Sequence, residues 1–322
     1  MDRGRLTKII VFFFIPVLIL FGLGLALGPL GASFLGIKTP AIFQVPKPTV
    51  ELPSEPIFHI SHFSVTNTLL ASWLTLLLLV GLSCLCTRNL KLIPGRGQGL
   101  IEAIVEGLLN FVESVAGKDQ ARRLFPGVAT IFLYVITNAY LALFPFFGSI
   151  GVIEHEGKFA PLLRSANTDV NVPLSIAFMS FIFVESWGMK SLGAFHYLSG
   201  FINVKQMGQG FKELGRGQIK SALMNVIFGF INLFVGVLEI FSHLTRMLSF
   251  TFRLFGNMTA GEILILVSCF LIPMAFTIPF YGLELLIGMI QAIIFSGLTL
   301  VFGTIAVSPH EETENHDERR TS

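Results

Sequence analysis

The sequence alternates between long apolar stretches and shorter polar segments, which is the pattern of helices that cross a membrane several times. A helix of about 20 apolar residues spans the hydrocarbon core of a bilayer. Such stretches lie at residues 9–30, 66–86, 125–147 and 171–193. The two that follow, 220–272 and 275–307, exceed one upright crossing and predict a hairpin of long, tilted helices. We therefore predict an all-α polytopic membrane protein with about six membrane-crossing helices.

Residues 98–116 show a different pattern, in which apolar side chains gather on one face of a helix. The glutamates fall outside that face, so we predict an amphipathic helix that lies along the membrane surface. The apolar face comprises Ile101, Val105, Leu108, Leu109 and Val112, and the glutamates are Glu102, Glu106 and Glu113.

The N-terminal segment allows two interpretations. Basic residues 1–8 precede the first apolar stretch, as in a secretory signal peptide. That stretch is long and no clean Ala-x-Ala site follows it, which favours a membrane helix that is retained. Residues 31–65 are rich in proline, contain His59 and His62, and form a predicted external segment. The predicted domains are an N-terminal part, a membrane domain and a charged cytoplasmic tail, with bounds 1–65, 66–308 and 309–322.

Composition excludes a soluble globular protein. Of the 322 residues, 53% are hydrophobic and 13% are charged, and the mean hydropathy is +0.75. A net charge of +2 gives no electrostatic basis for binding nucleic acid. Cys84, Cys86 and Cys269 lie within apolar stretches, so we interpret them as small core residues and not as disulfides or metal ligands.

The distribution of lysine and arginine predicts the orientation. Segments 1–8, 87–124 and 190–221 hold three, six and five of these residues, whereas 31–65 and 148–171 hold two each. Because cytoplasmic loops carry the excess of positive charge, both termini are predicted to be cytoplasmic.

One arginine lies deep in the longest apolar stretch. Arg253 stays protonated in essentially any environment, and near mid-bilayer this costs several kcal/mol unless the side chain faces a polar interior. On a helix with about 100° per residue, five polar residues fall within roughly 40° of it. They are Glu239, Ser242, Arg246, Ser249 and Asn257. A packing stripe mixes small residues and hydroxyl groups, so the arginines and glutamate indicate a functional surface.

The spacing about Pro273 predicts which polar residues share a depth in the membrane. Glu262 and Glu284 are each eleven residues from Pro273, and Arg253 and Gln291 are twenty and eighteen residues away. A hairpin centred there puts each pair at one level. Glu262 lies about 180° from the Arg253 stripe, so it faces a different partner.

The run Arg-Leu-Phe-Gly-Asn-Met-Thr-Ala-Gly-Glu at 253–262, with Glu239 before it and Gln291 after it, resembles subunit a of the F-type ATP synthases. The resemblance extends from about residue 58 to 306. It implies a non-catalytic subunit of the F0 sector that translocates ions through two offset half-channels at a rotating ring of c subunits. The implied partners are this c-ring, the b subunits of the peripheral stalk and the rest of the complex. The implied location is the bacterial plasma membrane.

The resemblance also implies roles for the polar residues. Ions reach a ring carboxylate from outside by way of Glu262, Glu284 and Asn257, and leave past Glu239 and Arg246, which share a stripe with Ser242 and Ser249. Arg253 favours the ionised ring carboxylate and blocks leakage between the half-channels. Three further residues are candidates for the outer path: Asn138, Asp169 and Asn171. The Asp-Val-Asn element at 169–171 is equally well explained as a plain helix N-cap.

One departure from the family concerns the coupling ion. Family members commonly pair a carboxylate with a histidine at the positions of Glu262 and Glu284, whereas here both are glutamate. Ionisable groups suit a proton relay, but two carboxylates also suit a hard cation that prefers oxygen ligands. The sequence favours H⁺ and leaves Na⁺ open.

Two other classes of protein fit the sequence less well. A secondary transporter explains an intramembrane Arg/Glu substrate site, but the sequence shows no inverted repeat with paired broken helices. A structural or assembly protein does not explain Arg253, Glu262 and Glu284 together. No nucleotide motif or His-Glu-x-x-His pattern is present, so we expect no catalysis, no metal and no cofactor.

Overall fold

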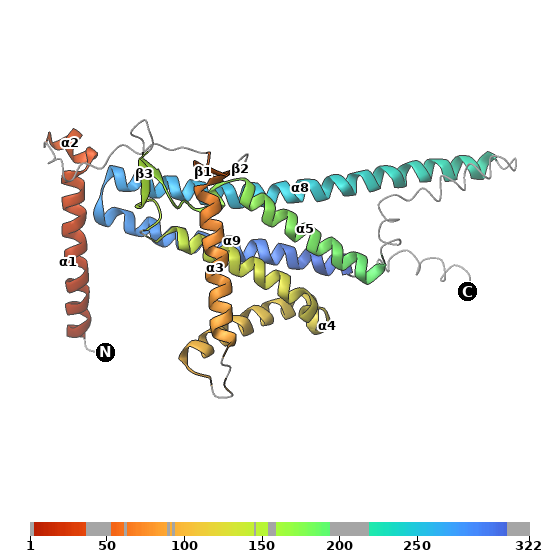
Figure 1. The fold of residues 1–322 in the computed structure, drawn as a ribbon, viewed down its shortest axis with the longest axis horizontal. Coiled ribbons are helices and arrows are strands. Elements are labelled where there is room, and N and C mark those ends of the chain that lie inside the picture. Colours follow the sequence, from red (N-terminus) through yellow and green to blue (C-terminus); the bar gives the residue numbers. More distant parts are fainter. Residues whose placement is uncertain are drawn as a thin grey trace. The chain divides into compact units, whose positions relative to one another are not determined.

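The computed structural model describes residues 3–36, 53–60, 63–88, 91, 94–144, 146–153, 159–193 and 219–307. Within these ranges five helices are long and apolar enough to cross a membrane. They are α3 (Asn67–Thr87), α4 (Arg96–Ala142), α5 (Asn171–Leu192), α8 (Ile219–Leu271) and α9 (Ile278–Val307) (Figure 1). A shorter apolar segment, Phe14–Ala26, lies in α1 (Arg3–Leu27). The prediction of an all-α polytopic membrane protein is confirmed.

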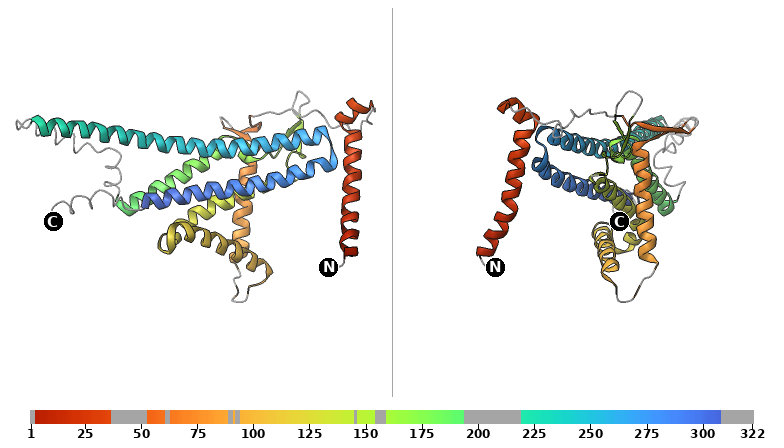
Figure 2. Two further views of the ribbon diagram at one scale, coloured as in Figure 1. Left: turned by 180° about the vertical axis from the view of Figure 1, so that it is seen from behind. Right: turned by 60° about the vertical axis from the view of Figure 1, so that its left-hand side comes forward.

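The C-terminal hairpin has the turn that the sequence predicts. α8 ends at Leu271, two residues before Pro273, which has no backbone N–H to continue a helix. A short 3-10 helix, η3 (Met274–Thr277), then leads into α9, and both views in Figure 2 show the two helices joined at this turn. With 53 residues at about 1.5 Å each, α8 is far longer than the hydrocarbon core is thick.

Helix α4 has other bounds than the helices that the sequence predicts in this part of the chain. α4 contains Gly117 with φ 73° and ψ 162°, a conformation that glycine adopts without steric cost. The part before Gly117 corresponds to the predicted amphipathic helix, of which Leu108 and Val112 are buried. The part after it begins with a segment that holds Lys118, Asp119, Arg122 and Arg123 and ends at Ala142. The helix therefore starts before the predicted span 125–147 and ends before residue 147. Charged residues in the first turns of a helix obscure where its apolar part starts.

Two short hairpins occupy polar segments for which the sequence predicted no strand. β1 (Pro56–Ile60) pairs antiparallel with β2 (Phe63–Thr66), and β3 (Gly151–Ile153) pairs antiparallel with β4 (Phe159–Pro161). A further short helix, α2 (Pro29–Leu35), follows α1. Strands of three to five residues are too short to show the alternation of apolar and polar residues that reveals longer strands.

The chain forms two compact units. The first comprises Met1–Gly81, Tyr134–Val172 and Arg253–Ala292, and the second comprises Leu82–Leu133, Pro173–Phe252 and Ile293–Ser322. The second unit has an apolar core of Val112, Ala121, Leu124, Val128 and Leu300. The first unit has more buried polar residues, and it contains Glu262 and Glu284.

Of the sequence predictions for the cysteines, for the segments outside the membrane and for the domain bounds, the structure contradicts one and leaves the others untested. The three cysteines are free, but Cys84 is exposed on α3, so its assignment to the core is wrong. His59 lies in β1, and His62 falls outside the described residues, as do residues 194–218 and the predicted tail 309–322. The domain bounds at 65 and 308 stay predictions.

Candidate functional site

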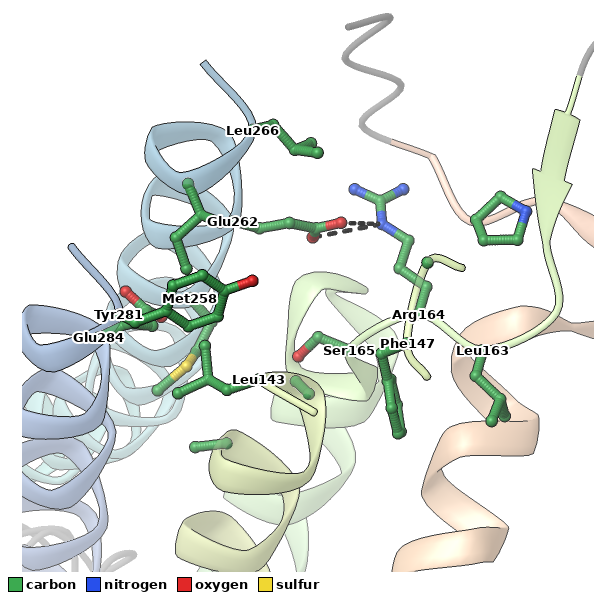
Figure 3. A pocket seen from close by; sticks show the side chains of 15 residues that line it. Leu143, Phe147, Leu163, Arg164, Ser165, Met258, Glu262, Leu266, Tyr281 and Glu284 are labelled. Atoms are coloured by element: carbon green, nitrogen blue, oxygen red, sulfur yellow. Dashed lines mark hydrogen bonds and ion pairs between the residues drawn. The ribbon is translucent and has the colours of Figure 1, made fainter. Parts of the chain in front are cut away.

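A pocket of about 160 Å³ in the first unit contains both predicted carboxylates. Its walls come from the end of α4, the segment between α4 and α5, the C-terminal part of α8 and the start of α9 (Figure 3). Glu262 reaches it from α8, and Glu284 reaches it from α9 beside Tyr281. The remaining wall is mostly apolar, with side chains such as Leu143, Phe147, Leu163, Met258 and Leu266.

Glu262 forms an ion pair that the sequence analysis missed. The Nε of Arg164 lies 3.1 Å from Oε1 and 3.3 Å from Oε2 of Glu262, and the two side chains are 11% and 29% exposed (Figure 3). Arg164 also donates from Nη1 to the carbonyl of Pro53 at 3.4 Å. A guanidinium whose donors meet a carboxylate and a carbonyl is held firmly in place.

A sequence signal for Arg164 was present. It is the one arginine of the polar segment 148–171, five residues before Asp169. The sequence shows it only as one of two positive charges in this segment, because nothing in the sequence indicates that the segment folds back against α8.

Glu284 is brought to the same level of the hairpin as Glu262 by a close approach of α8 and α9. Its side chain is 7% exposed and lies against Gly261, the residue before Glu262. A Cβ atom added at Gly261 would collide with the Glu284 carboxylate. The equal distances of the two glutamates from Pro273 therefore predicted correctly that they share one level of the hairpin.

The candidates Asp169 and Asn171 make a local cap and one long-range contact. Oδ1 of Asp169 accepts hydrogen bonds from the backbone N and from Nδ2 of Asn171, both at 3.0 Å, at the start of α5. This is the geometry of a helix cap. Oδ2 of Asp169 accepts a hydrogen bond from Oγ1 of Thr68 on α3 at 2.9 Å, so the carboxylate also ties two elements together.

Asn138 lies in a buried polar cluster beside the pocket. Its Nδ2 donates to Oδ1 of Asn167 at 3.2 Å, and the two residues are 1% and 0% exposed. Oδ1 of Asn138 and Nδ2 of Asn167 have no hydrogen-bond partner among the described residues. Buried polar atoms of this kind commonly bind an ordered water molecule. The neighbouring Ala139 lines the pocket, so the cluster adjoins the pocket along α4.

The Arg253 stripe lies on another face of α8. In the first unit, Arg253 and Asn257 are exposed and neither lines the pocket, while Gln291 on α9 is 6% exposed. In the second unit, Glu239, Ser242 and Ser249 are exposed. Arg246 is half-buried, and its guanidinium carbon lies 3.5 Å from the centre of the Phe302 ring. Within the described residues Arg253 forms no ion pair with Glu262 or Glu284.

Comparison with known families decides between the classes of protein that the sequence left open. The sequence profile of the family described as ATP synthase A chain matches residues 69–304. The chain belongs to this family. Its members are F0 subunits with a role in proton translocation, so the resemblance found in the sequence is confirmed and a secondary transporter is set aside.

Individual relatives match this chain over most of their length. The ATP synthase subunit a of Gloeobacter violaceus is 31% identical over 248 residues, which are 76% of this chain and 85% of the relative. That of Campylobacter fetus is 28% identical over 254 residues, 79% of this chain and 95% of the relative. That of Nitratidesulfovibrio vulgaris is 31% identical over 231 residues, 72% and 82% respectively.

Proposed function

We propose that this chain carries protons through two offset half-channels that meet at a ring of c subunits in an ATP synthase. The observation that supports this most is the division of charged groups on α8. Glu262 faces a pocket inside the first unit, whereas Arg253 is exposed on the protein surface. An exposed arginine in a membrane-spanning helix needs a polar or anionic partner. A ring carboxylate is such a partner.

The outer half-channel begins in the pocket and ends at Glu284. The polar atoms of Asn138, Asn167 and Asp169 supply sites for water along this path. Glu262 is held by Arg164, so its negative charge is compensated within the chain. Glu284 lies beside it, and its carboxyl group is the one that takes up and passes on the proton. Without Arg164 two carboxylates would face one small pocket, which is unfavourable in a membrane interior.

Arg253 controls the proton on the ring. A cation within a few ångströms of an acid lowers the acid's pKa by about 1–3 units, which corresponds to about 1.4–4 kcal/mol. A membrane potential of 100 mV supplies about 2.3 kcal/mol per charge. The two quantities are comparable, so Arg253 releases the proton from the ring carboxylate while the field can still drive the ring past it. Asn257 lies one helical turn from Arg253 on the same face of α8, so it is a further polar group at the place where the ring carboxylate releases its proton.

The inner half-channel follows the exposed face of α8 in the second unit. Ser249, Arg246, Ser242 and Glu239 succeed one another there at helical spacing. A proton that leaves the ring after rotation reaches the cytoplasm along these groups. The proposed partners are the c-ring, the b subunits of the peripheral stalk and the remaining complex. The proposed location is a bacterial plasma membrane with both chain termini in the cytoplasm.

Vesicles that contain the complete complex test the function and the coupling ion together. The chain should copurify with a soluble ATPase and an oligomeric ring of small helical hairpins. With sodium at trace levels, ATP synthesis driven by ΔpH and potential should proceed and should stop on addition of a protonophore. Synthesis that needs added Na⁺ and resists the protonophore would overturn the proton assignment. Absence of the ATPase and the ring from the purified complex would overturn the function itself.

A further inference from the structure

The second unit holds a pair of titratable side chains that the proposed half-channels do not use. Nδ1 of His243 on α8 lies 3.3 Å from Oε1 of Glu185 on α5. The histidine and glutamate side chains are only 17% and 14% exposed. Ionisable residues within a membrane-spanning helix are costly and usually mark a path for ions or protons.

Two cavities adjoin this pair, and both have Glu185 and His243 in their walls. The larger, of about 190 Å³, is otherwise apolar, and its walls include Phe178, Ile240 and Leu244. The smaller, of about 20 Å³, also reaches Ser180 and Arg246. The pair therefore lies between apolar surroundings on one side and polar groups on the other.

An aromatic ring packs against the imidazole. The rings of Phe181 on α5 and His243 form a T-shaped pair, with 5.8 Å between centres and 67° between planes. The Glu185 carboxylate, 3.3 Å from Nδ1, and the Phe181 ring thus hold His243 beside Glu185. A neighbouring carboxylate is a common partner of an imidazole that transfers protons.

The position of His243 on α8 links it to the polar stripe. It is four residues after Glu239 and three before Arg246, and residues at these spacings are neighbours on a helix surface. Within the described part of the chain, helix spacing therefore puts Glu239 and Arg246 of α8 beside the pair, whose other member is Glu185 of α5. From α9, residues 293–307 contribute no titratable side chain.

We propose that Glu185 and His243 form a proton-transfer pair in the inner half-channel. The imidazolium gives the proton on Nδ1 to the carboxylate Oε1, so that an ion pair becomes a neutral imidazole beside a neutral carboxylic acid. Both forms hold one proton and have no net charge, and the pair stays in the membrane without an uncompensated charge. A proton taken from the Arg246 side is matched by one released on the Glu239 side. The pathway thus runs between α5 and α8 as well as along the exposed stripe.

This inference rests on the proposed function, and the complete complex in liposomes tests it. In Glu185→Gln and His243→Gln complexes, ATP-driven proton pumping is expected to fall on the order of 10- to 100-fold, as when a proton-transferring group is removed. The dependence of the rate on inner-side pH is expected to become weaker, because a group that exchanges protons on that side is lost. The dependence on outer-side pH should stay as in the wild type. The swapped variant Glu185→His with His243→Glu should recover part of the rate.

Met247→Leu is the matched control, because Met247 lines both cavities and has no titratable group. It should keep the wild-type rate and inner-side pH profile. Unchanged rates and unchanged profiles in the Gln variants would overturn the inference and leave the pair a packing contact. If those variants fail to assemble, the wild-type complex can be treated with diethyl pyrocarbonate from the inner side and analysed by mass spectrometry. Modification of His243 supports water access, and its absence overturns the inference.

A separate variant tests the proposed function independently of the proton-transfer pair. If an Arg253→Ala complex in the same liposomes still couples ATP synthesis to proton flow, the half-channel mechanism is wrong. If that variant is inactive while Glu185→Gln and His243→Gln pump normally, only the proton-transfer pair is wrong.

Discussion

The charged residues on two faces of α8 differ in whether the chain itself supplies a counter-charge. On the face toward the pocket, Glu262 has its counter-charge within the chain, supplied by Arg164 at 3.1 Å. On the other face, Arg253 and Asn257 are exposed and the chain gives Arg253 no carboxylate within the described residues. In the function proposed above, the internally compensated Glu262 belongs to the fixed part of the outer path. The exposed Arg253 is proposed to find its anionic partner on the c-ring.

The largest effect is expected when the exposed face loses its charge. Arg253→Ala should abolish ATP synthesis driven by a proton gradient, because nothing then favours the ionised ring carboxylate or blocks leakage. Arg253→Lys should also be severely impaired, since a compact, strongly hydrated ammonium does not replace a planar guanidinium. Synthesis is measured in inverted vesicles, with immunodetection of the inserted subunit as the control. Normal coupled synthesis in the Ala variant would show that the exposed face has no special role.

The next largest effect is expected when a carboxyl group of the pocket is removed. This change should slow proton flow without opening a passive proton leak. Glu284→Gln removes the buried carboxyl group that we propose to exchange protons, and it should lower proton flow on the order of 10-fold or more. Glu262→Gln should have a smaller effect, because that carboxylate is engaged by Arg164. Neither change should raise passive proton conductance, since Arg253 still separates the half-channels. Raised conductance with unchanged synthesis in Glu262→Gln would contradict the assignment of this face.

Much of this contrast was accessible from the sequence. The helical spacing of Glu239, Arg246 and Arg253 shows the stripe, and equal distances from Pro273 place Glu262 and Glu284 at one level of the hairpin. These inferences succeed because a long apolar helix has a regular geometry that residue numbers alone determine. The role of the stripe itself stays a prediction.

The contacts that the sequence did not predict involve a loop and the relative rotation of two helices, and neither follows a regular pattern in the sequence. Arg164 lies in a loop, and its contact with Glu262 spans 98 positions along the chain. The Glu185–His243 pair joins two helices whose relative rotation no periodic pattern specifies. Long-range partners of this kind are set by tertiary packing, and a single sequence carries no direct record of it.

The ion pair itself offers a way to sharpen the comparison. Arg164→Gln leaves Glu262 without its counter-charge and should slow proton flow several-fold. Combining it with Glu262→Gln removes both charges, so the double variant should be less impaired than the sum of the single changes. Residues in direct contact typically show interaction energies of about 0.5–3 kcal/mol in such a cycle. Strictly additive effects on the rate would mean that Arg164 and Glu262 act independently.

The smallest effect concerns the approach of α8 and α9 that brings the two glutamates together. At Gly261 an added Cβ atom would collide with the Glu284 carboxylate, so Gly261→Ala should push the helices apart or displace that carboxylate. Inserting a methyl group into a packed site typically costs about 1–3 kcal/mol. Gly282→Ala on α9 is the matched control, because nothing lies within 4 Å of a Cβ atom there. Thermal unfolding of the purified complexes should show a lowered midpoint for Gly261→Ala only, together with a moderate loss of proton flow. Equal midpoints for the two variants would mean that the contact between Gly261 and Glu284 does not define the pocket.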